Sequence, residues 1–320
     1  WLESDRMGFL LPALTQEKLD NQKLVVRNER RQSYENRPYG MTWWWLFENL
    51  YPEGHPYHIP TIGKHEDIDA ANLKDVKDFF KQWYVPNNAS LSVTGDFDPK
   101  EAKALIEKYF GDLPRGPQPE PILKVDPVVL TEEIVIRKTD DVPHHKVWIA
   151  WHSPALYQPG DAEFDTLSNA LSAGKDSRLY RKLVEESQIA QEVSAYQVSS
   201  LLSSFYVVEA TASEGKNPDD VVAAIDEVLA QVKESGITEE EVTLAQTSWE
   251  ANFFRGMQTI ARKGNQLNQY YILTGDTDYI AKDLARFLNV TPEGVHAAAK
   301  KLGTGRLVLH IGPQSTEEGK

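Results

Sequence analysis

Residues 24–36 have the sequence LVVRNERRQSYEN and lie in a segment, from Thr15 to about Tyr51, whose pattern predicts helix. Apolar side chains such as Leu19 and Val26 recur there near helical spacing, with many charges between them. Glu29 is flanked by arginines on this charged helix. A carboxylate in that setting is, by itself, typical of a solvated helix face, so its meaning depends on the rest of the chain.

The composition indicates a globular protein large enough for two domains. The chain has 320 residues, 41% of them hydrophobic and 26% charged, and no apolar run approaches the length of a membrane-spanning helix. Its net charge of -14 argues against nonspecific binding to nucleic acid or anionic lipid and favours basic or neutral partners. The absence of cysteine excludes disulfides and thiolate zinc ligands.

The sequence pattern of the first part of the chain predicts helices, one strand and a linker. Helices are expected over 67–84 and 98–110, with a strand over 88–96 between them. Residues 43–45 are three consecutive tryptophans in an apolar helix, so some face a core and the rest another surface, with core packing favoured over ligand binding. Four prolines within residues 113–121 have no core-forming period and indicate a linker.

The part beyond the linker mixes strands with many helices. Strands are predicted over 133–138, 146–152, 190–198, 204–212 and 306–311. Helices are predicted over 161–173, 177–186, 218–232, 238–254, 261–273, 279–288 and 292–302.

We therefore expect a domain over 1–113, a proline-rich linker over 114–127, a second domain over 128–313 and a tail over 314–320. A helix followed by a short loop and a strand occurs at 67–95 and again at 292–312, a faint repeat that supports two copies of one α+β unit.

Several short motifs occur in an order and rough spacing that resemble one family. They are ESDRM (residues 3–7), VVRNE (25–29), PYG (38–40), VTGDF (93–97) and SRLY (177–180). Together they resemble the pitrilysin/insulinase-type zinc metallopeptidases, among them bacterial subunits similar to mitochondrial processing peptidase. The resemblance implies an α+β fold of two related domains, each a mixed or antiparallel sheet covered by helices, with the first domain incomplete here.

The resemblance implies that Glu29 is the third protein ligand of a catalytic zinc. The other two ligands would be the histidines of a His-x-x-Glu-His helix, whose glutamate would act as general base on zinc-bound water. That motif does not occur in the sequence and is expected upstream of Trp1. The chain alone is therefore predicted to be metal-free and inactive. Gln22 stands two helical turns before Glu29, where family members often carry a supporting glutamate, and keeps hydrogen-bonding ability without the charge.

The resemblance also implies partners. A second homologous half or subunit would face this one to enclose a chamber, in which a peptide substrate adds a strand to a sheet edge. Arg178 and Tyr180 are candidates for contact with substrate or partner, whereas the family's substrate-holding Arg/Tyr pair has no assigned position. Absent cysteine and family habit favour a bacterial periplasmic or extracytoplasmic setting over the cytoplasm.

Other interpretations stay open at this point. A noncatalytic partner or scaffold subunit shares the fold while losing ligands, and an unrelated α+β peptide-binding module would require the ordered motifs to be accidental. Two groups of histidines, at 55–65 and 144–152, lack a carboxylate at ligand spacing and favour surface roles over a metal site. No nucleophile elbow or phosphate-binding glycine motif occurs.

Overall fold

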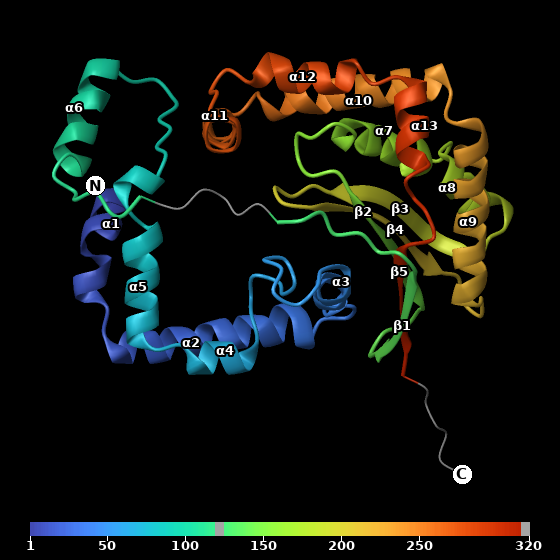
Figure 1. Cartoon of the computed structure of the whole chain (residues 1–320), viewed down its shortest axis with the longest axis horizontal. Coiled ribbons are helices and arrows are strands. Elements are labelled where there is room, and N and C mark those ends of the chain that lie inside the picture. The colour runs from blue at the N-terminus through green and yellow to red at the C-terminus, as the bar shows by residue number, and fades with distance from the viewer. Residues whose placement is uncertain (119–124, 315–320) are drawn as a thin grey trace, which may run out of the picture. The chain divides into compact units, whose positions relative to one another are not determined.

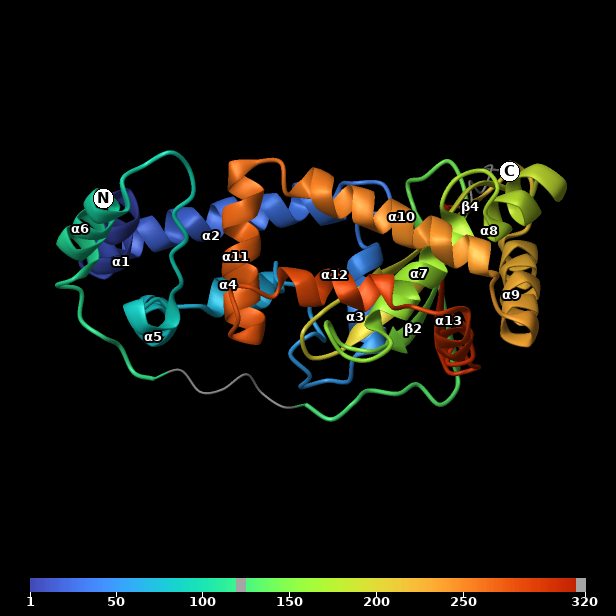
Figure 2. The same ribbon diagram turned by 90° about the horizontal axis from the view of Figure 1, so that it is seen from above.

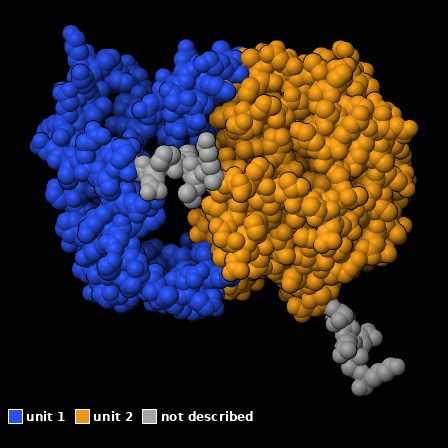
Figure 3. All heavy atoms as spheres, viewed as in Figure 1, with its two compact units in different colours: residues 1–32, 62–123, 252–282 blue, residues 33–61, 124–251, 283–320 orange. Residues whose placement is uncertain are grey.

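The computed structural model of the protein describes residues 1–118 and 125–314. The chain divides into two compact units, coloured separately in Figure 3. Unit 1 comprises residues 1–32, 62–123 and 252–282, and unit 2 comprises residues 33–61, 124–251 and 283–320.

These units are defined by spatial contacts, whereas each predicted domain is a continuous stretch of the sequence. The predicted linker over 114–127 and tail over 314–320 fall partly outside the described residues, at 119–124 and 315–320. The predicted domain boundaries stay a prediction.

Unit 2 contains a five-stranded sheet in the order β1-β5-β2-β4-β3. Its strands are β1 (Glu133–Asp140), β2 (Lys146–Ser153), β3 (Ala190–Val198), β4 (Ser204–Ala212) and β5 (Arg306–Pro313). β1 and β5 run parallel, and every other neighbouring pair is antiparallel. The five strands predicted beyond the linker are confirmed, with small changes at their ends, and so is the α+β fold class.

The three central strands are apolar on both faces. β2, β4 and β5 have nearly continuous buried runs, whereas the edge strands β1 and β3 have mixed exposure. Continuous hydrophobic runs are typical of strands covered on both sides. The sheet therefore requires a layer of side chains on each of its faces.

Helices cover the first face and form the larger core. They include α7 (Asp161–Ser172), α8 (Arg178–Tyr180), α9 (Pro218–Ser235) and α13 (Pro292–Ala299), and α8 continues into the π-helical turn η3 (Arg181–Glu186). Figures 1 and 2 show α7, α9 and α13 beside the sheet. One face of α9 is buried, with side chains from Val221 to Val232, and Asn217 caps its first turn.

The short helix α3 (Thr42–Leu50) packs on the other face of the sheet. Leu46 and Leu50 are almost fully buried in a second core that includes Trp148 and Phe205. Among the three tryptophans, Trp44 is buried, Trp45 packs against this core and Trp43 is 37% exposed. The expectation that they divide between core and another surface is confirmed.

Unit 1 is helical in its described part. Its helices are α1 (Leu2–Ala13), α2 (Gln16–Arg30), α4 (His65–Ala70), α5 (Leu73–Trp83), the 3-10 turn η2 (Pro86–Asn88), α6 (Pro99–Phe110) and α11 (Ile260–Thr274). α10 (Glu239–Gly256) and α12 (Ile280–Leu288) contain residues of both units. α2 continues into the π-helical turn η1 (Arg31–Glu35). Within residues 1–118 and 125–314, no helix has the length and apolarity needed to cross a bilayer.

The single helix predicted over 67–84 is wrong, because two helices occupy that range. α4 ends before Asn72, and Asn72 begins α5 with a capping box. Its side chain accepts hydrogen bonds from the backbone N–H groups of Lys74 and Asp75, and the Asp75 carboxylate accepts from the Asn72 N–H. This reciprocal cap stabilises a new helix start over continuation of α4.

The strand predicted over 88–96 is also wrong. After η2 the chain is irregular there, and Leu91 and Val93 are 53% and 45% exposed. Strands require a neighbouring backbone for their hydrogen bonds, and no described strand pairs with this segment. The faint repeat is consequently complete only in its second copy, where β5 follows α13.

A network of charged groups connects α7 and α12 within unit 2. The Arg286 guanidinium donates to Asp161 at 2.7 Å and to Asp283 at 2.8 Å, and Gln197 donates to the other Asp161 oxygen at 2.6 Å. One turn further along α7, burial raises the pKa of Asp165 to about 7, and the neighbouring Asp161 charge adds to this effect.

Replacing Leu46 tests the packing of α3 on the sheet. We expect Leu46→Ala to lower the free energy of unfolding by about 2–5 kcal/mol, because Leu46 is fully buried. Leu244→Ala is the control, since Leu244 is 62% exposed and should change stability by less than about 0.5 kcal/mol. Denaturant titration measures both variants, and equal effects would contradict the packing of α3.

The raised pKa of Asp165 predicts a pH-dependent stability. Between about pH 4 and pH 7 the folded chain keeps a proton that the unfolded chain loses, so stability falls as the pH rises through that window. Asp165→Asn should therefore stabilise the protein at about pH 8, by an amount on the order of 2 kcal/mol since water still reaches part of the side chain, and much less near pH 4. Thermal denaturation at both pH values, with Glu163→Gln as control, checks this; a gain independent of pH would contradict it.

Candidate functional site

The predicted zinc ligand lies on a helix that is firmly attached within unit 1. Thr15 caps α2, and Arg27 pairs with Asp69 at 3.1 Å. Lys23 donates to the Asp69 carbonyl oxygen at 3.0 Å, which joins α2 to the end of α4. The backbone that carries Glu29 is therefore held in place by its neighbours.

Glu29 itself is free of such contacts. Its side chain is exposed, and among the described residues it makes no hydrogen bond and no ion pair. Gln22, seven positions earlier and therefore near the same helix face, is also exposed. Both predicted residues are thus accessible, and their assignment to a zinc site stays a prediction.

The residues present do not fit a zinc ion by themselves. Over residues 1–118 and 125–314, no three His, Asp or Glu side chains converge at metal-ligand distance. His58 and His152 instead contact the carbonyl oxygens of Tyr51 and Leu50, each at 2.8 Å. Glu29 is a single donor, whereas catalytic zinc takes three protein ligands.

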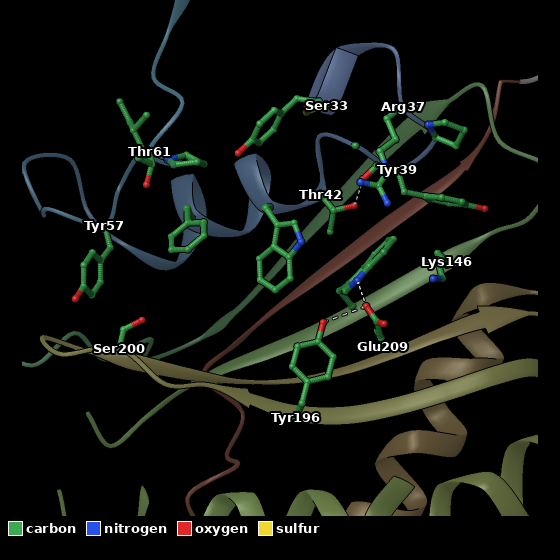
Figure 4. Close-up of a pocket in the computed structure, with 18 of the residues that line it drawn as sticks. Ser33, Arg37, Tyr39, Thr42, Tyr57, Thr61, Lys146, Tyr196, Ser200 and Glu209 are labelled. Atoms are coloured by element: carbon green, nitrogen blue, oxygen red, sulfur yellow. Dashed lines mark hydrogen bonds between the residues drawn. The ribbon is translucent and has the colours of Figure 1, made fainter. Parts of the chain in front are cut away.

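A cavity of about 940 Å³ lies in unit 2, between residues 33–61 and the sheet. Figure 4 shows Tyr196, Lys146 and Glu209 on the strands, with Arg37, Tyr39 and Thr42 on the opposite wall. The aromatic residues that line it are Tyr34, Tyr39, Trp43, Phe47, Tyr57, Trp148 and Tyr196. An aromatic-lined cavity with a few polar groups is the usual form of a ligand site.

Glu209 supplies the negative charge of this cavity. The indole N–H of Trp148 donates to Glu209 Oε2 at 2.6 Å, and the Tyr196 hydroxyl donates to the same oxygen at 3.2 Å. Trp148 is the register partner of Glu209, and Tyr196 pairs with Val207, so the three side chains share one face. Burial, followed by the Glu209 charge, raises the pKa of Tyr196, so its hydroxyl stays protonated and continues to donate.

Lys146 supplies a positive charge that is already paired. Its ammonium lies 3.2 Å from Glu192 and above the rings of Tyr39 and Trp148, at 5.6 and 5.7 Å. Hydrogen bonds from Thr211 and then from Lys146 lower the pKa of Glu192. The Glu192 carboxylate therefore stays charged over the physiological pH range.

The PYG motif (residues 38–40) joins the wall of the cavity that residues 33–61 form to the sheet. The Tyr39 N–H donates to Asp140 Oδ2 at 2.9 Å, and its hydroxyl donates to the His144 carbonyl at 2.6 Å. Tyr39 has a φ of 56°, and a Cβ on Gly40 would lie 2.1 Å from the Tyr34 carbonyl oxygen. Only glycine fits at position 40 without a backbone shift.

Arg178 and Tyr180 lie at α8. The Arg178 guanidinium donates twice to the Glu241 carboxylate, each time at 2.7 Å, and so joins α8 to the start of α10. Tyr180 packs against the larger core. Both side chains are therefore engaged in contacts within unit 2. A role for them in substrate or partner contact stays a prediction.

The sequence interpretation missed the Glu209 cavity. A usable signal was present, because Glu209 is the one charged residue in the strand SFYVVEATA. Its donors come from β2 and β3, so only the sheet register brings the three side chains together.

Comparison with known proteins identifies relatives of this chain. The profile of the family described as "Peptidase M16 inactive domain" matches residues 70–248. The "Zinc protease PqqE" of Helicobacter pylori is 27% identical over 286 residues, which are 87% of this chain and 63% of that protein. The chain thus spans about six tenths of the length of the curated relatives it matches.

Two solved structures share the fold. A protease from Helicobacter pylori aligns with a TM-score of 0.84 and 24% identity, over 94% of this chain and 73% of that one. A peptidase M16 inactive domain from Pseudomonas fluorescens aligns with a TM-score of 0.82 and 18% identity, over 98% and 74% of the two chains. Since the family profile covers more than half of its residues, the chain belongs to the Peptidase M16 inactive domain family of zinc-protease-like proteins.

Proposed function

We propose that this chain is part of a zinc metalloendopeptidase to which it contributes Glu29 as one of three metal ligands. The observation that carries the proposal is the free Glu29 carboxylate, exposed on a helix whose neighbouring charges are engaged. The two histidine ligands and the general base belong to a His-x-x-Glu-His segment on polypeptide outside this sequence. The relatives named zinc proteases are longer than this chain, which leaves room for such a segment.

The substrate is a peptide or an unfolded chain. In this proposal a second homologous half, covalent or separate, faces this one and encloses a chamber that excludes folded proteins. The sheet has two edge strands, β1 and β3, to which an extended peptide adds by backbone hydrogen bonds that are largely indifferent to sequence. At β3, Ser172 already contacts the backbone of Ala195, which leaves β1 as the less obstructed edge.

The second candidate function is that of a noncatalytic partner or scaffold subunit. It is favoured by the family profile, which describes the inactive peptidase domain and covers residues 70–248. In this role the chain forms part of the chamber wall, and the zinc ligands all belong to the partner. The two candidates differ in whether Glu29 contacts the metal.

The chain alone is expected to be inactive and free of stoichiometric zinc. One carboxylate does not hold catalytic zinc, so elemental analysis after dialysis should find less than about 0.1 zinc per chain. A quenched fluorescent peptide should remain uncleaved by the purified chain. One tightly bound zinc per chain, with no other polypeptide present, would contradict the proposed division of the site.

Replacing Glu29 distinguishes the two candidates. In an assembly of this chain with the polypeptide that carries His-x-x-Glu-His, Glu29→Gln should weaken zinc binding by at least about 100-fold and abolish peptide cleavage, because a direct ligand is lost. Glu17→Gln removes a charge from the exposed start of the same helix and should leave both properties unchanged. Unchanged zinc content in the Glu29 variant would favour the scaffold subunit.

A further inference from the structure

We propose that the cavity above Glu209 binds a cationic side chain of a peptide segment, with arginine as the preferred residue. This inference concerns unit 2 alone and does not depend on the role of Glu29. It assigns a recognition role to a cavity that takes no part in the proposed zinc site or in peptide addition at the sheet edge.

The first argument is the organisation of the carboxylate. Both hydrogen bonds from Trp148 and Tyr196 end on Glu209 Oε2, whereas Oε1 has no hydrogen-bond partner in the described part of the chain. Glu209 lines the cavity, so this second oxygen is available to a ligand. Its donors are fixed on neighbouring strands, so little reorganisation is needed when a ligand binds.

The second argument is the nature of the walls. The rings of Trp148 and Tyr196 lie next to the carboxylate, and Trp43 and Tyr57 line the cavity as well. A guanidinium group stacks on aromatic faces while it donates to a carboxylate, and it is more weakly hydrated than an ammonium group. Aromatic rings beside one open carboxylate oxygen therefore favour arginine over a neutral or acidic side chain.

The third argument is the charge balance. Lys146 is paired with Glu192, so these two side chains together carry no net charge. Arg37 lies on the opposite wall without an ion pair in the described ranges, and its guanidinium is a donor for backbone carbonyls of the same bound segment. The net charge of -14 further favours a basic partner through long-range attraction.

The size of the cavity is consistent with this occupant. Its volume of about 940 Å³ accommodates a long side chain together with part of the adjacent peptide backbone. A peptide with a single arginine, blocked at both ends, is therefore a sufficient probe.

The test compares two blocked heptapeptides, acetyl-Gly-Ser-Ala-Arg-Ala-Ser-Gly-amide and the same peptide with citrulline, which is neutral but similar in shape. We expect the wild-type chain to bind the arginine peptide at least about tenfold more tightly in isothermal titration, because a charge-assisted hydrogen bond is lost with citrulline. Glu209→Gln should reduce that ratio to about one while retaining an acceptor for Trp148 and Tyr196.

Two control variants accompany this comparison. Glu214→Gln makes the same charge change at an exposed position outside the cavity and should retain the tenfold preference. Arg37→Gln should weaken the binding of both peptides to a similar degree and so retain the tenfold ratio, since Arg37 donates to backbone carbonyls that the two peptides share. Thermal denaturation of each variant verifies that the fold is intact.

Three results would overturn the proposal. They are absence of measurable binding of the arginine peptide to the folded wild-type chain, equal affinity for the two peptides, and a preference that survives in the Glu209 variant. None of these results bears on zinc binding by Glu29, so the two proposals fail separately.

Discussion

The structure of unit 2 depends on a sheet whose central strands are apolar on both faces. Such strands are stable only when side chains exclude water from each side. Helices cover the first face, and the second is covered by residues 33–61, which are joined to the sheet through Tyr39 and Tyr51. The cavity above Glu209 lies between that covering layer and the strands.

The sequence predicted elements well where local patterns decide them. The bounds of β3 and β4 agree with the prediction, although only β4 is a nearly continuous apolar run. The break before α5 was missed although its signal, Asn72 followed by Asp75, is a capping box. The segment over 88–96 has the pattern of a strand, but pairing depends on a distant backbone, which no local pattern reveals.

The two candidate sites differ in how much of each could be predicted from the sequence. Glu29 was identified only through ordered motifs, since a carboxylate on a charged helix has no distinctive local pattern, and the structure adds that it is exposed and unpaired. Glu209 was missed because its significance depends on donors from two other strands. A charged residue inside an apolar strand is expensive to bury unless it is hydrogen-bonded. A lone acidic residue in such a strand is therefore a signal to seek its donors.

The two carboxylates also differ in the further groups that each would need to bind its proposed ligand. Glu209 is held by two protein donors to one oxygen, so the cation site proposed there is formed by residues of this chain alone. Glu29 has no donor that holds it among the described residues, and a catalytic zinc ion there would need two further protein ligands. The proposed recognition of a basic peptide is therefore independent of assembly, whereas the proposed zinc site is not. Under the two proposals, the chain selects its peptide on unit 2, whereas metal binding at Glu29 depends on ligands from a partner.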